Sequence, residues 1–317
     1  MNLPPSPPGA RIVAFGEHQP SGVVTNADLA ERVDTSDEWI QSRVGIKERR
    51  IAGPDESVLD MAVAAGGKAL AASGLAADDI SLVIVATCTG LDQIPNVSAS
   101  AAARLGITAP GAFDVNAACA GFCYALGIAN DAVRGGSAGH VLVIGAEKLS
   151  DWIDWTDRST CVIFADGAGA AVVGPSEAPQ IGPVVWGSSG ERADKIYLRE
   201  HKYLHQEGQA VFRWTTTELS AVALTALERA GVAPEELTAF VPHQANLRIV
   251  EAIARKVGAP QALIARDIVT AGNTSSASIP LALSRMVGRG ELPSGSTVLT
   301  LGYGAGLTYA AQVLRVP

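Results

Sequence analysis

The chain has 317 residues, enough for two fused domains, and 48% of them are hydrophobic, so a large core can be buried. With 24 basic and 32 acidic residues the net charge is −8, which argues against nucleic acid as a partner. Apolar runs such as residues 82–86 are far too short to cross a membrane. The four cysteines lack metal-ligand spacing, so we expect no metal site and a cytoplasmic protein with reduced thiols.

Short Val- and Ile-rich runs alternate with Ala-rich helical stretches, after a Pro-rich segment over residues 1–10 that we interpret as a flexible tail. In chain order, the first half is expected to contain a helix at 57–73, a strand at 80–87, a helix at 96–105 and a strand at 140–145. The second half is expected to contain a helix at 216–230, a strand at 238–241, a helix at 245–257 and a strand at 297–301. This alternation predicts an α/β fold with a largely buried sheet.

Two glycine-rich segments repeat each other near the end of each half. Residues 165–170 (ADGAGA) and 302–307 (GYGAGL) each read as a turn that leads into an apolar strand. We interpret this as an internal duplication with a junction near residues 174–182, so that one domain covers residues 11–174 and a second covers 175–317. Because Gly-Ala-rich turns are common, the repeat does not establish the duplication by itself.

Cys119 lies in the segment 113–122 (FDVNAACAGF), where an expected strand passes into an expected helix. Backbone N–H groups at the start of a helix lack partners and carry partial positive charge. They stabilise a thiolate, so we expect a lowered thiol pKa and a nucleophilic Cys119 whose small neighbours leave room for a thioester. A buried structural cysteine is the alternative, and it is our interpretation for the other three cysteines.

His243 and Asn273 each follow an expected strand and precede an expected helix, as Cys119 does. Taken alone, His243 could be a core histidine satisfied by the backbone, and Asn273 could be a turn residue or a helix cap. Because such strand ends collect into one cleft in α/β sheets, we expect the three side chains to share a site.

Three motifs in this order carry a resemblance to a known family: AACAGF (117–122), VPHQANLRI (241–249) and GNTSSAS (272–278). They resemble the active-site motifs of β-ketoacyl-acyl-carrier-protein synthase III, the initiating condensing enzyme of bacterial fatty-acid synthesis. The similarity spans nearly the whole chain and looks most like the actinobacterial members. It implies a thiolase-like α/β fold, duplicated into five layers α/β/α/β/α, in a homodimer.

The resemblance also implies a ping-pong reaction that uses acyl-CoA and malonyl-acyl-carrier protein. Cys119 would take the acyl group from acyl-CoA. His243 and Asn273 would hydrogen-bond the malonyl thioester carbonyl during decarboxylation, and the backbone N–H groups of Cys119 and Ala305 would form a second oxyanion site. No cofactor of its own is implied, because the partner protein carries the phosphopantetheine.

Further positions match family contacts to CoA, to the primer and to the carrier protein. Ile94 matches a residue that lines the primer pocket across the dimer interface. The expected CoA contacts are Thr35, Trp39, Arg43 and Asn246. A basic patch would dock the acidic carrier protein, and its members would be Arg213, Arg248, Arg255 and Lys256. The alternatives are helix packing by Trp39 and a merely solvated charged face at Arg255 and Lys256.

Two positions depart from the usual family pattern. Ala305 stands in GYGAG (302–306), where the family commonly has Phe followed by three glycines, and its methyl group is expected to tighten the acyl site. Asp151 stands where some members carry a basic CoA contact, which puts phosphate binding there in doubt.

Other functions remain open. A specialised secondary-metabolite acyltransferase of the same fold could transfer acyl groups to oxygen or nitrogen, although the complete set of Cys119, His243 and Asn273 favours condensation. A degradative thiolase would normally need a second cysteine near its C-terminus, and no cysteine follows Cys161. A non-catalytic subunit that only binds carrier protein would normally lack the nucleophile. No flavin, nicotinamide or P-loop fingerprint points to other chemistry.

Overall fold

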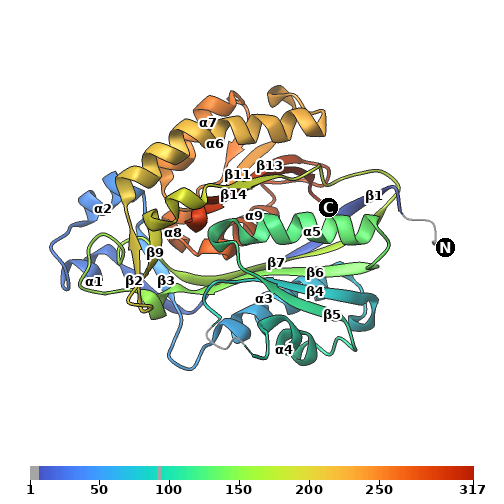
Figure 1. The fold of residues 1–317 in the computed structure, drawn as a ribbon, viewed down its shortest axis with the longest axis horizontal. Coiled ribbons are helices and arrows are strands. Elements are labelled where there is room, and N and C mark those ends of the chain that lie inside the picture. The colour runs from blue at the N-terminus through green and yellow to red at the C-terminus, as the bar shows by residue number, and fades with distance from the viewer. Residues whose placement is uncertain (1–6, 91–93) are drawn as a thin grey trace.

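Two five-stranded sheets lie face to face, with helices packed between them and further helices on both outer faces (Figure 1). The computed structural model describes residues 7–90 and 94–317. Helices α3 and α4 cover the outer face of the first sheet, α5 and α9 lie between the sheets, and α6 and α7 cover the second sheet. The layer order is therefore α/β/α/β/α, as expected.

The strands of the first sheet, in spatial order, are β1 (Gly9–His18), β7 (Asp166–Ser176), β6 (His140–Lys148), β4 (Ile80–Ala86) and β5 (Gly111–Val115). Those of the second are β12 (Leu263–Ile264), β11 (Ala239–Pro242), β13 (Thr297–Gly304), β14 (Thr308–Arg315) and β8 (Val185–Ser188). The layer helices are α3 (Val58–Ser73), α4 (Val97–Arg104), α5 (Gly121–Arg134), α6 (Gly208–Ala230), α7 (Leu247–Val257) and α9 (Ser278–Gly288).

Smaller elements surround this frame. Two short antiparallel ribbons pair β2 (Gly22–Thr25) with β3 (Glu48–Ile51), and β9 (Ile196–Arg199) with β10 (Tyr203–Gln206). The remaining α-helices are α1 (Asn26–Ala30), α2 (Asp37–Val44) and α8 (Ile268–Ala271). Short 3₁₀ turns precede α5 (Ala118–Ala120) and α9 (Ser275–Ala277).

The two sheets have the same topology, which confirms the internal duplication. In the first sheet β4 pairs in parallel with β5 and β6, while β7 pairs antiparallel with β6 and β1. In the second sheet β11 pairs in parallel with β12 and β13, while β14 pairs antiparallel with β13 and β8. Strands β4, β6 and β7 therefore correspond to β11, β13 and β14.

The boundaries of the halves differ slightly from those expected. Strand β1 begins at Gly9, and Ala10 is fully buried, so the last two residues of the expected tail belong to the first sheet. Strand β7 continues to Ser176 and β8 begins at Val185. We therefore propose that the division between the halves falls in residues 177–184, which overlaps the expected junction near residues 174–182.

Helix α6 begins eight residues earlier than the sequence predicts. Consecutive threonines at 215–217 have low helix propensity and lead one to expect a later start. Their hydroxyl groups instead donate to backbone carbonyls one turn earlier: Thr215 to Val211, Thr216 to Phe212 and Thr217 to Arg213. These bonds satisfy the threonine side chains inside the helix.

The glycine-rich segments expected as turns are largely strand. Asp166 begins β7, and Gly304 ends β13. Their glycines permit close approach to neighbouring backbone, because a Cβ on Gly169 would lie 2.4 Å from the nitrogen of Leu281 in α9. The glycines of these segments thus allow neighbouring layers to pack closely, and they do not form turns.

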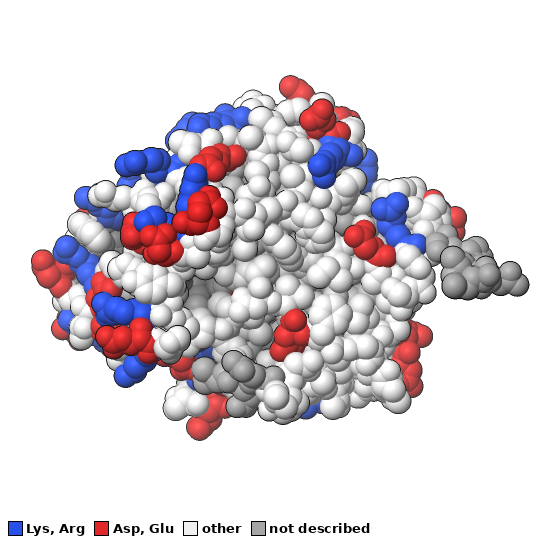
Figure 2. Space-filling model, in the orientation of Figure 1, with Lys and Arg blue, Asp and Glu red and all other residues white. Residues whose placement is uncertain are grey.

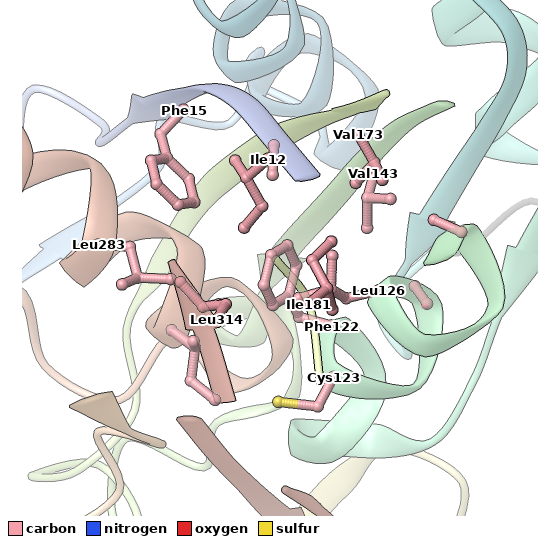
Figure 3. Close-up of a cluster of buried hydrophobic side chains, with 14 of the residues drawn as sticks. Ile12, Phe15, Phe122, Cys123, Leu126, Val143, Val173, Ile181, Leu283 and Leu314 are labelled. Carbon is pink, nitrogen blue, oxygen red and sulfur yellow. The ribbon is translucent and has the colours of Figure 1, made fainter. Parts of the chain in front are cut away.

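The largest apolar cluster fills the space between the sheets (Figure 3). Phe122 and Leu126 of α5 pack there with Leu283 of α9, and Ile12 and Leu314 come from the two sheets. Separate apolar clusters lie between each sheet and its outer helices. Helices α5 and α9 are therefore buried on both sides, and this packing holds the residues at their N-termini in place.

Gly145 of β6 offers a test of this close packing. A Cβ there would lie 2.5 Å from the carbonyl oxygen of Ser276 in the other half. We expect Gly145→Ala to lower the free energy of unfolding by about 1–3 kcal/mol through overpacking. Gly67→Ala is the control, because its Cβ would meet only Leu105 at 3.4 Å, an ordinary contact. Urea unfolding measures both, and equal stability of the two variants would contradict the packing.

Candidate active site

One cavity of about 1320 Å³ brings together residues from both halves of the chain. Cys119, His243, Asn273 and Ala305 all line it. Cys119, His243 and Ala305 follow strands, but the expectation of a strand before Asn273 is wrong, because helix α8 precedes this residue. The cavity continues outward past further expected residues, which are Trp39, Arg43, Arg213, Asn246 and Arg248. Four expected residues do not line it: Thr35, Ile94, Arg255 and Lys256.

Cys119 lies in the 3₁₀ turn between β5 and α5, directly ahead of the buried helix. Ala118 before it has φ 46°, a left-handed conformation that is unusual for a residue other than glycine. Gly304 approaches so closely that a Cβ would lie 3.1 Å from Cys119 Sγ. Thr308 Oγ1 donates to the carbonyl of Ala117 at 2.9 Å, which ties the two turns together.

The expected lowering of the Cys119 pKa is wrong for the free protein. Burial raises the pKa of this thiol to about 12, and the nearby Glu147 carboxylate acts in the same direction. A hydrogen bond with Ser275 lowers the pKa but does not compensate for burial. The cost of burying a thiolate exceeds what these local donors return. Cys119 is therefore a neutral thiol at neutral pH.

His243 follows β11 and is almost fully buried, with an exposed fraction of 1%. Its Nδ1 lies 2.7 Å from Ser278 Oγ, and its ring meets that of Tyr303 edge-on at 5.1 Å. The Tyr303 hydroxyl donates to the His243 carbonyl at 3.3 Å. Burial lowers the pKa of His243 to about 3, so its imidazole is neutral under physiological conditions.

Asn273 is held by its backbone and its amide oxygen. Its N–H donates to the carbonyl of Ile163, and its carbonyl accepts from Ala165. Its Oδ1 accepts the N–H of Ser275 at 2.9 Å, and the side chain is 3% exposed. Because the oxygen is engaged, the amide nitrogen is left as the donor that Asn273 can offer to the cavity.

Trp39 lies at the outer part of the cavity beside two guanidinium groups. Arg158 lies 4.9 Å and Arg43 lies 5.8 Å from the centre of its ring. Asn246 caps α7 by accepting the N–H of Arg248, and its amide donates to the carbonyl of Arg43. An aromatic face flanked by fixed cations suits a planar, negatively charged ligand.

Thr35, Ile94 and Asp151 lie apart from this arrangement. The hydroxyl oxygen of Thr35 is buried and has no hydrogen-bond partner among residues 7–90 and 94–317. Ile94 is 91% exposed. Asp151 lies 3.8 Å from the ammonium group of Lys148, so this acidic residue has a local ion-pair partner.

The expected docking residues lie on or beside α7. Arg213, Arg248, Arg255 and Lys256 are all exposed. Arg248 lies 5.2 Å over the ring of Phe212, and Lys256 donates to the carbonyl of Thr216. Within the described part of the chain, none of the four forms an ion pair. Figure 2 shows basic side chains along the edge where α6 and α7 lie.

The inward face of α7 is set by its strongest apolar stripe. Leu247 and Ala254 are only partly buried. The buried residues are Ile249, Val250, Ile253 and Val257. The helix is therefore rotated so that its strongest apolar stripe, not the first apolar residue, meets the sheet.

Several residues at the site were missed by the sequence reasoning. Ser278 and Tyr303 contact His243, and Arg158 flanks Trp39. Glu147 is fully buried and accepts hydrogen bonds from Thr89, Ser275 and Ser276. A charged residue at the end of an apolar strand was the one available signal for Glu147, because buried carboxylates are rare unless paired.

The described residues contain no group of three or more His, Cys, Asp or Glu side chains that could hold a metal ion. Nor does any helix within them have the length and apolar character needed to cross a membrane.

The layered fold and a thiol-bearing cavity between duplicated halves define a thiolase-like condensing enzyme. A model of 3-oxoacyl-(acyl-carrier-protein) synthase III matches residues 113–190, and the model of its C-terminal part matches residues 227–316. The chain is 55% identical to β-ketoacyl-(acyl-carrier-protein) synthase III 4 of Streptomyces coelicolor, over 98% of this chain and 99% of that protein. It is 49% identical to the mycobacterial synthase III of Mycobacterium avium, over 98% and 97%.

Solved structures give the same result. The priming β-ketosynthase of a polyketide biosynthetic pathway superposes with a TM-score of 0.96 at 43% identity, covering 100% of this chain and 98% of that one. The Aquifex aeolicus synthase III has a TM-score of 0.94 at 42% identity, with 97% and 100% covered. The chain therefore belongs to the β-ketoacyl-(acyl-carrier-protein) synthase III family and is an acyltransferase.

The pKa of His243 has a consequence for stability. In the unfolded chain its pKa is about 6.5, so between pH 6.5 and pH 3 the unfolded state binds a proton that the folded state does not. The stability contributed by the neutral ring is complete above pH 6.5 and is lost as the pH falls. Between pH 7 and pH 5 we expect the wild-type protein to lose about 2 kcal/mol more unfolding free energy than His243→Gln. Urea unfolding at both pH values measures this, and parallel losses would contradict it.

Proposed function

We propose that the protein starts fatty-acid or polyketide synthesis by decarboxylative condensation of an acyl-CoA primer with malonyl-acyl-carrier protein. The observation that carries the proposal is the single cavity that contains Cys119, His243 and Asn273. A thiol, a neutral imidazole and an amide are the groups that this chemistry needs, because one forms the covalent intermediate and two donate to an oxyanion. Family membership supports the same reaction.

In the first half-reaction, Cys119 attacks the thioester carbonyl of acyl-CoA. A bond forms between Cys119 Sγ and the acyl carbon, the carbon–sulfur bond to CoA breaks, and the thiol proton ends on the CoA sulfur. Because burial raises the pKa of this thiol to about 12, Cys119 is protonated in the free protein. Backbone N–H groups of Cys119 and Ala305, on turns that Thr308 ties together, would receive the oxyanion.

In the second half-reaction, the malonyl thioester loses carbon dioxide and becomes an enolate. His243 and Asn273 donate hydrogen bonds to its oxygen, and the carbanion carbon then attacks the acyl group on Cys119. Both donors are neutral, so their strength does not depend on protonation near neutral pH. The bond between Cys119 Sγ and the acyl carbon breaks, and the released thiolate takes up a proton from solvent. The products are β-ketoacyl-acyl-carrier protein, carbon dioxide and the free thiol.

The outer cavity would hold CoA. Trp39 flanked by Arg158 and Arg43 fits an adenine base and the phosphates attached to the nucleotide. The Asn246 side chain, which caps α7 and bonds Arg43, lies where it could exchange one of these contacts for the pantetheine arm. Thr35 does not line this cavity, so its contact with CoA stays a prediction of the family resemblance.

We further propose that the protein is a homodimer and is located in the cytoplasm. Strand β5 forms one edge of the first sheet, and Phe113 on it is 38% exposed. An exposed edge strand with apolar side chains favours pairing with a second copy. Ile94, exposed on the loop before α4, would then reach the partner's primer pocket. A polyketide role is supported by the structural likeness to a priming β-ketosynthase.

Intact-mass measurement tests the covalent step. We expect incubation with a panel of acyl-CoAs to add one acyl group to the wild-type protein and none to Cys119→Ala. Malonyl-acyl-carrier protein should then discharge the acyl group as a β-ketoacyl product, because condensation regenerates the thiol. Cys123→Ala is the matched control, since Cys123 lies one turn later and is fully buried.

The other outcomes separate the rival functions. Loading without discharge by the malonyl donor would indicate an acyltransferase that uses an oxygen or nitrogen acceptor. Absence of loading by every acyl-CoA would contradict the use of CoA primers and favour a non-catalytic, carrier-protein-binding subunit.

Charge reversal tests the carrier-protein surface. Arg255 and Lys256 lie outside the cavity, so their double change to Glu should raise KM for malonyl-acyl-carrier protein about tenfold at low salt, through lost attraction to an acidic partner. Loading from acyl-CoA should be unchanged. The control is the double change of Arg134 and Arg229 to Glu, two exposed positions at other helix ends. Equal KM values for the two double variants would contradict docking at α7.

A further inference from the structure

Ser278 reaches the site only through His243. It lies in the first turn of α9, and its hydroxyl oxygen lies 2.7 Å from His243 Nδ1. Both side chains are buried, with exposed fractions of 2% and 1%. Ser278 is not among the residues that line the cavity, whereas His243 is. Of the side chains that line the cavity, Ser278 therefore bonds only the imidazole ring of His243 within the described residues.

The hydrogen bonds of Ser278 determine which ring nitrogen of His243 carries the hydrogen. Ser278 Oγ accepts the backbone N–H of Gln244 at 3.3 Å. Across residues 7–90 and 94–317, the only other partner of this hydroxyl is His243 Nδ1. A hydroxyl group has one hydrogen to donate, and a buried donor without an acceptor is unfavourable. The hydroxyl hydrogen therefore goes to Nδ1, which must be unprotonated.

A neutral imidazole with an unprotonated Nδ1 carries its hydrogen on Nε2. The lowered pKa of His243 agrees with a neutral ring. We propose that Ser278 is a positioning residue that fixes His243 as the Nε2–H tautomer, so that the ring donates to the malonyl thioester oxygen. This inference rests on the proposed function, because that reaction supplies the oxygen.

The fixed tautomer assigns His243 one of two conceivable roles. A ring whose Nε2 already bears hydrogen, and whose Nδ1 accepts from Ser278, has no free site for the proton of Cys119. His243 therefore acts as a hydrogen-bond donor during decarboxylation and not as a general base during acyl transfer. The two half-reactions should consequently respond differently to loss of the Ser278 hydroxyl.

The test combines Ser278→Ala with separate assays of the half-reactions. We expect decarboxylation of malonyl-acyl-carrier protein to fall about tenfold to a hundredfold, as for other residues that set the orientation and tautomer of a functional histidine. Acyl loading of Cys119 from acyl-CoA should stay within about twofold, because this step does not use the Nε2 donor. Ser278→Thr retains the hydroxyl and should restore most of the decarboxylation.

Ser98→Ala is the matched control. Its hydroxyl is equally buried and hydrogen-bonds the Phe113 carbonyl and Asp114, but it neither contacts His243 nor lines the cavity. An equal fall of decarboxylation in Ser98→Ala and Ser278→Ala would overturn the inference, since it would indicate a general effect of removing a buried hydroxyl. So would an equal loss of both half-reactions in Ser278→Ala.

A direct measurement of the tautomer separates this inference from the proposed function. Nitrogen-15 NMR of the histidine-labelled wild-type protein, with His243→Gln used for assignment, should show a protonated Nε2 and an unprotonated Nδ1. Ser278→Ala should shift the ring toward the other tautomer. A protonated Nδ1 in the wild-type protein would overturn the inference even in an active enzyme. Absence of both half-reactions in the wild type would instead refute the proposed function.

Discussion

The buried carboxylate of Glu147 holds the two halves of the molecule in register at the site. It lies at the end of β6 in the first half and accepts hydrogen bonds from both halves. The donors are the N–H groups of Cys88 and Thr89 and the hydroxyl groups of Thr87, Thr89, Ser275 and Ser276. Each buried donor left without an acceptor costs about 1–3 kcal/mol, so this single carboxylate fixes two loops together. The second loop follows Asn273, and this link sets the position of the amide relative to Cys119.

Burial keeps the thiol and the imidazole of the cavity neutral. Burial raises the pKa of the Cys119 thiol and lowers that of His243, so neither is charged at neutral pH. Charge then develops only when a thioester reacts, and the donors are already in place when it does. Left-handed backbone at Ala118 and Ser275 is part of this preorganisation, since such strain persists only where the surrounding packing enforces it.

Local patterns in the sequence predicted an α/β fold and placed Cys119 and His243 at the ends of strands, because apolar periodicity marks helices and strands. The five layers and the roles of Cys119, His243 and Asn273 were instead implied by the resemblance of three motifs to a known family. The residues that orient them could not be predicted in this way. Ser278 is 35 positions from His243, and Glu147 is 128 positions from Ser275, so their contacts exist only in the folded chain. The predicted lowering of the Cys119 pKa was wrong for a related reason. The start of the helix can be predicted from the sequence, but the burial that outweighs its effect on the pKa cannot.

The two duplicated halves differ at equivalent turns, and this difference explains why only one of the turns carries the nucleophile. The turns before α5 and α9 have the same backbone form, a left-handed residue that opens a short 3₁₀ turn ahead of a buried helix. Ala118 in the first turn corresponds to Ser275 in the second, so Cys119 corresponds to Ser276. The Cys119 thiol lines the cavity, whereas the Ser276 hydroxyl donates to Ala86 and Glu147. One copy of the turn thus presents a nucleophile, and the other supports Asn273 and joins the halves. A second reactive group at that position would break the link to Glu147 on which the site depends.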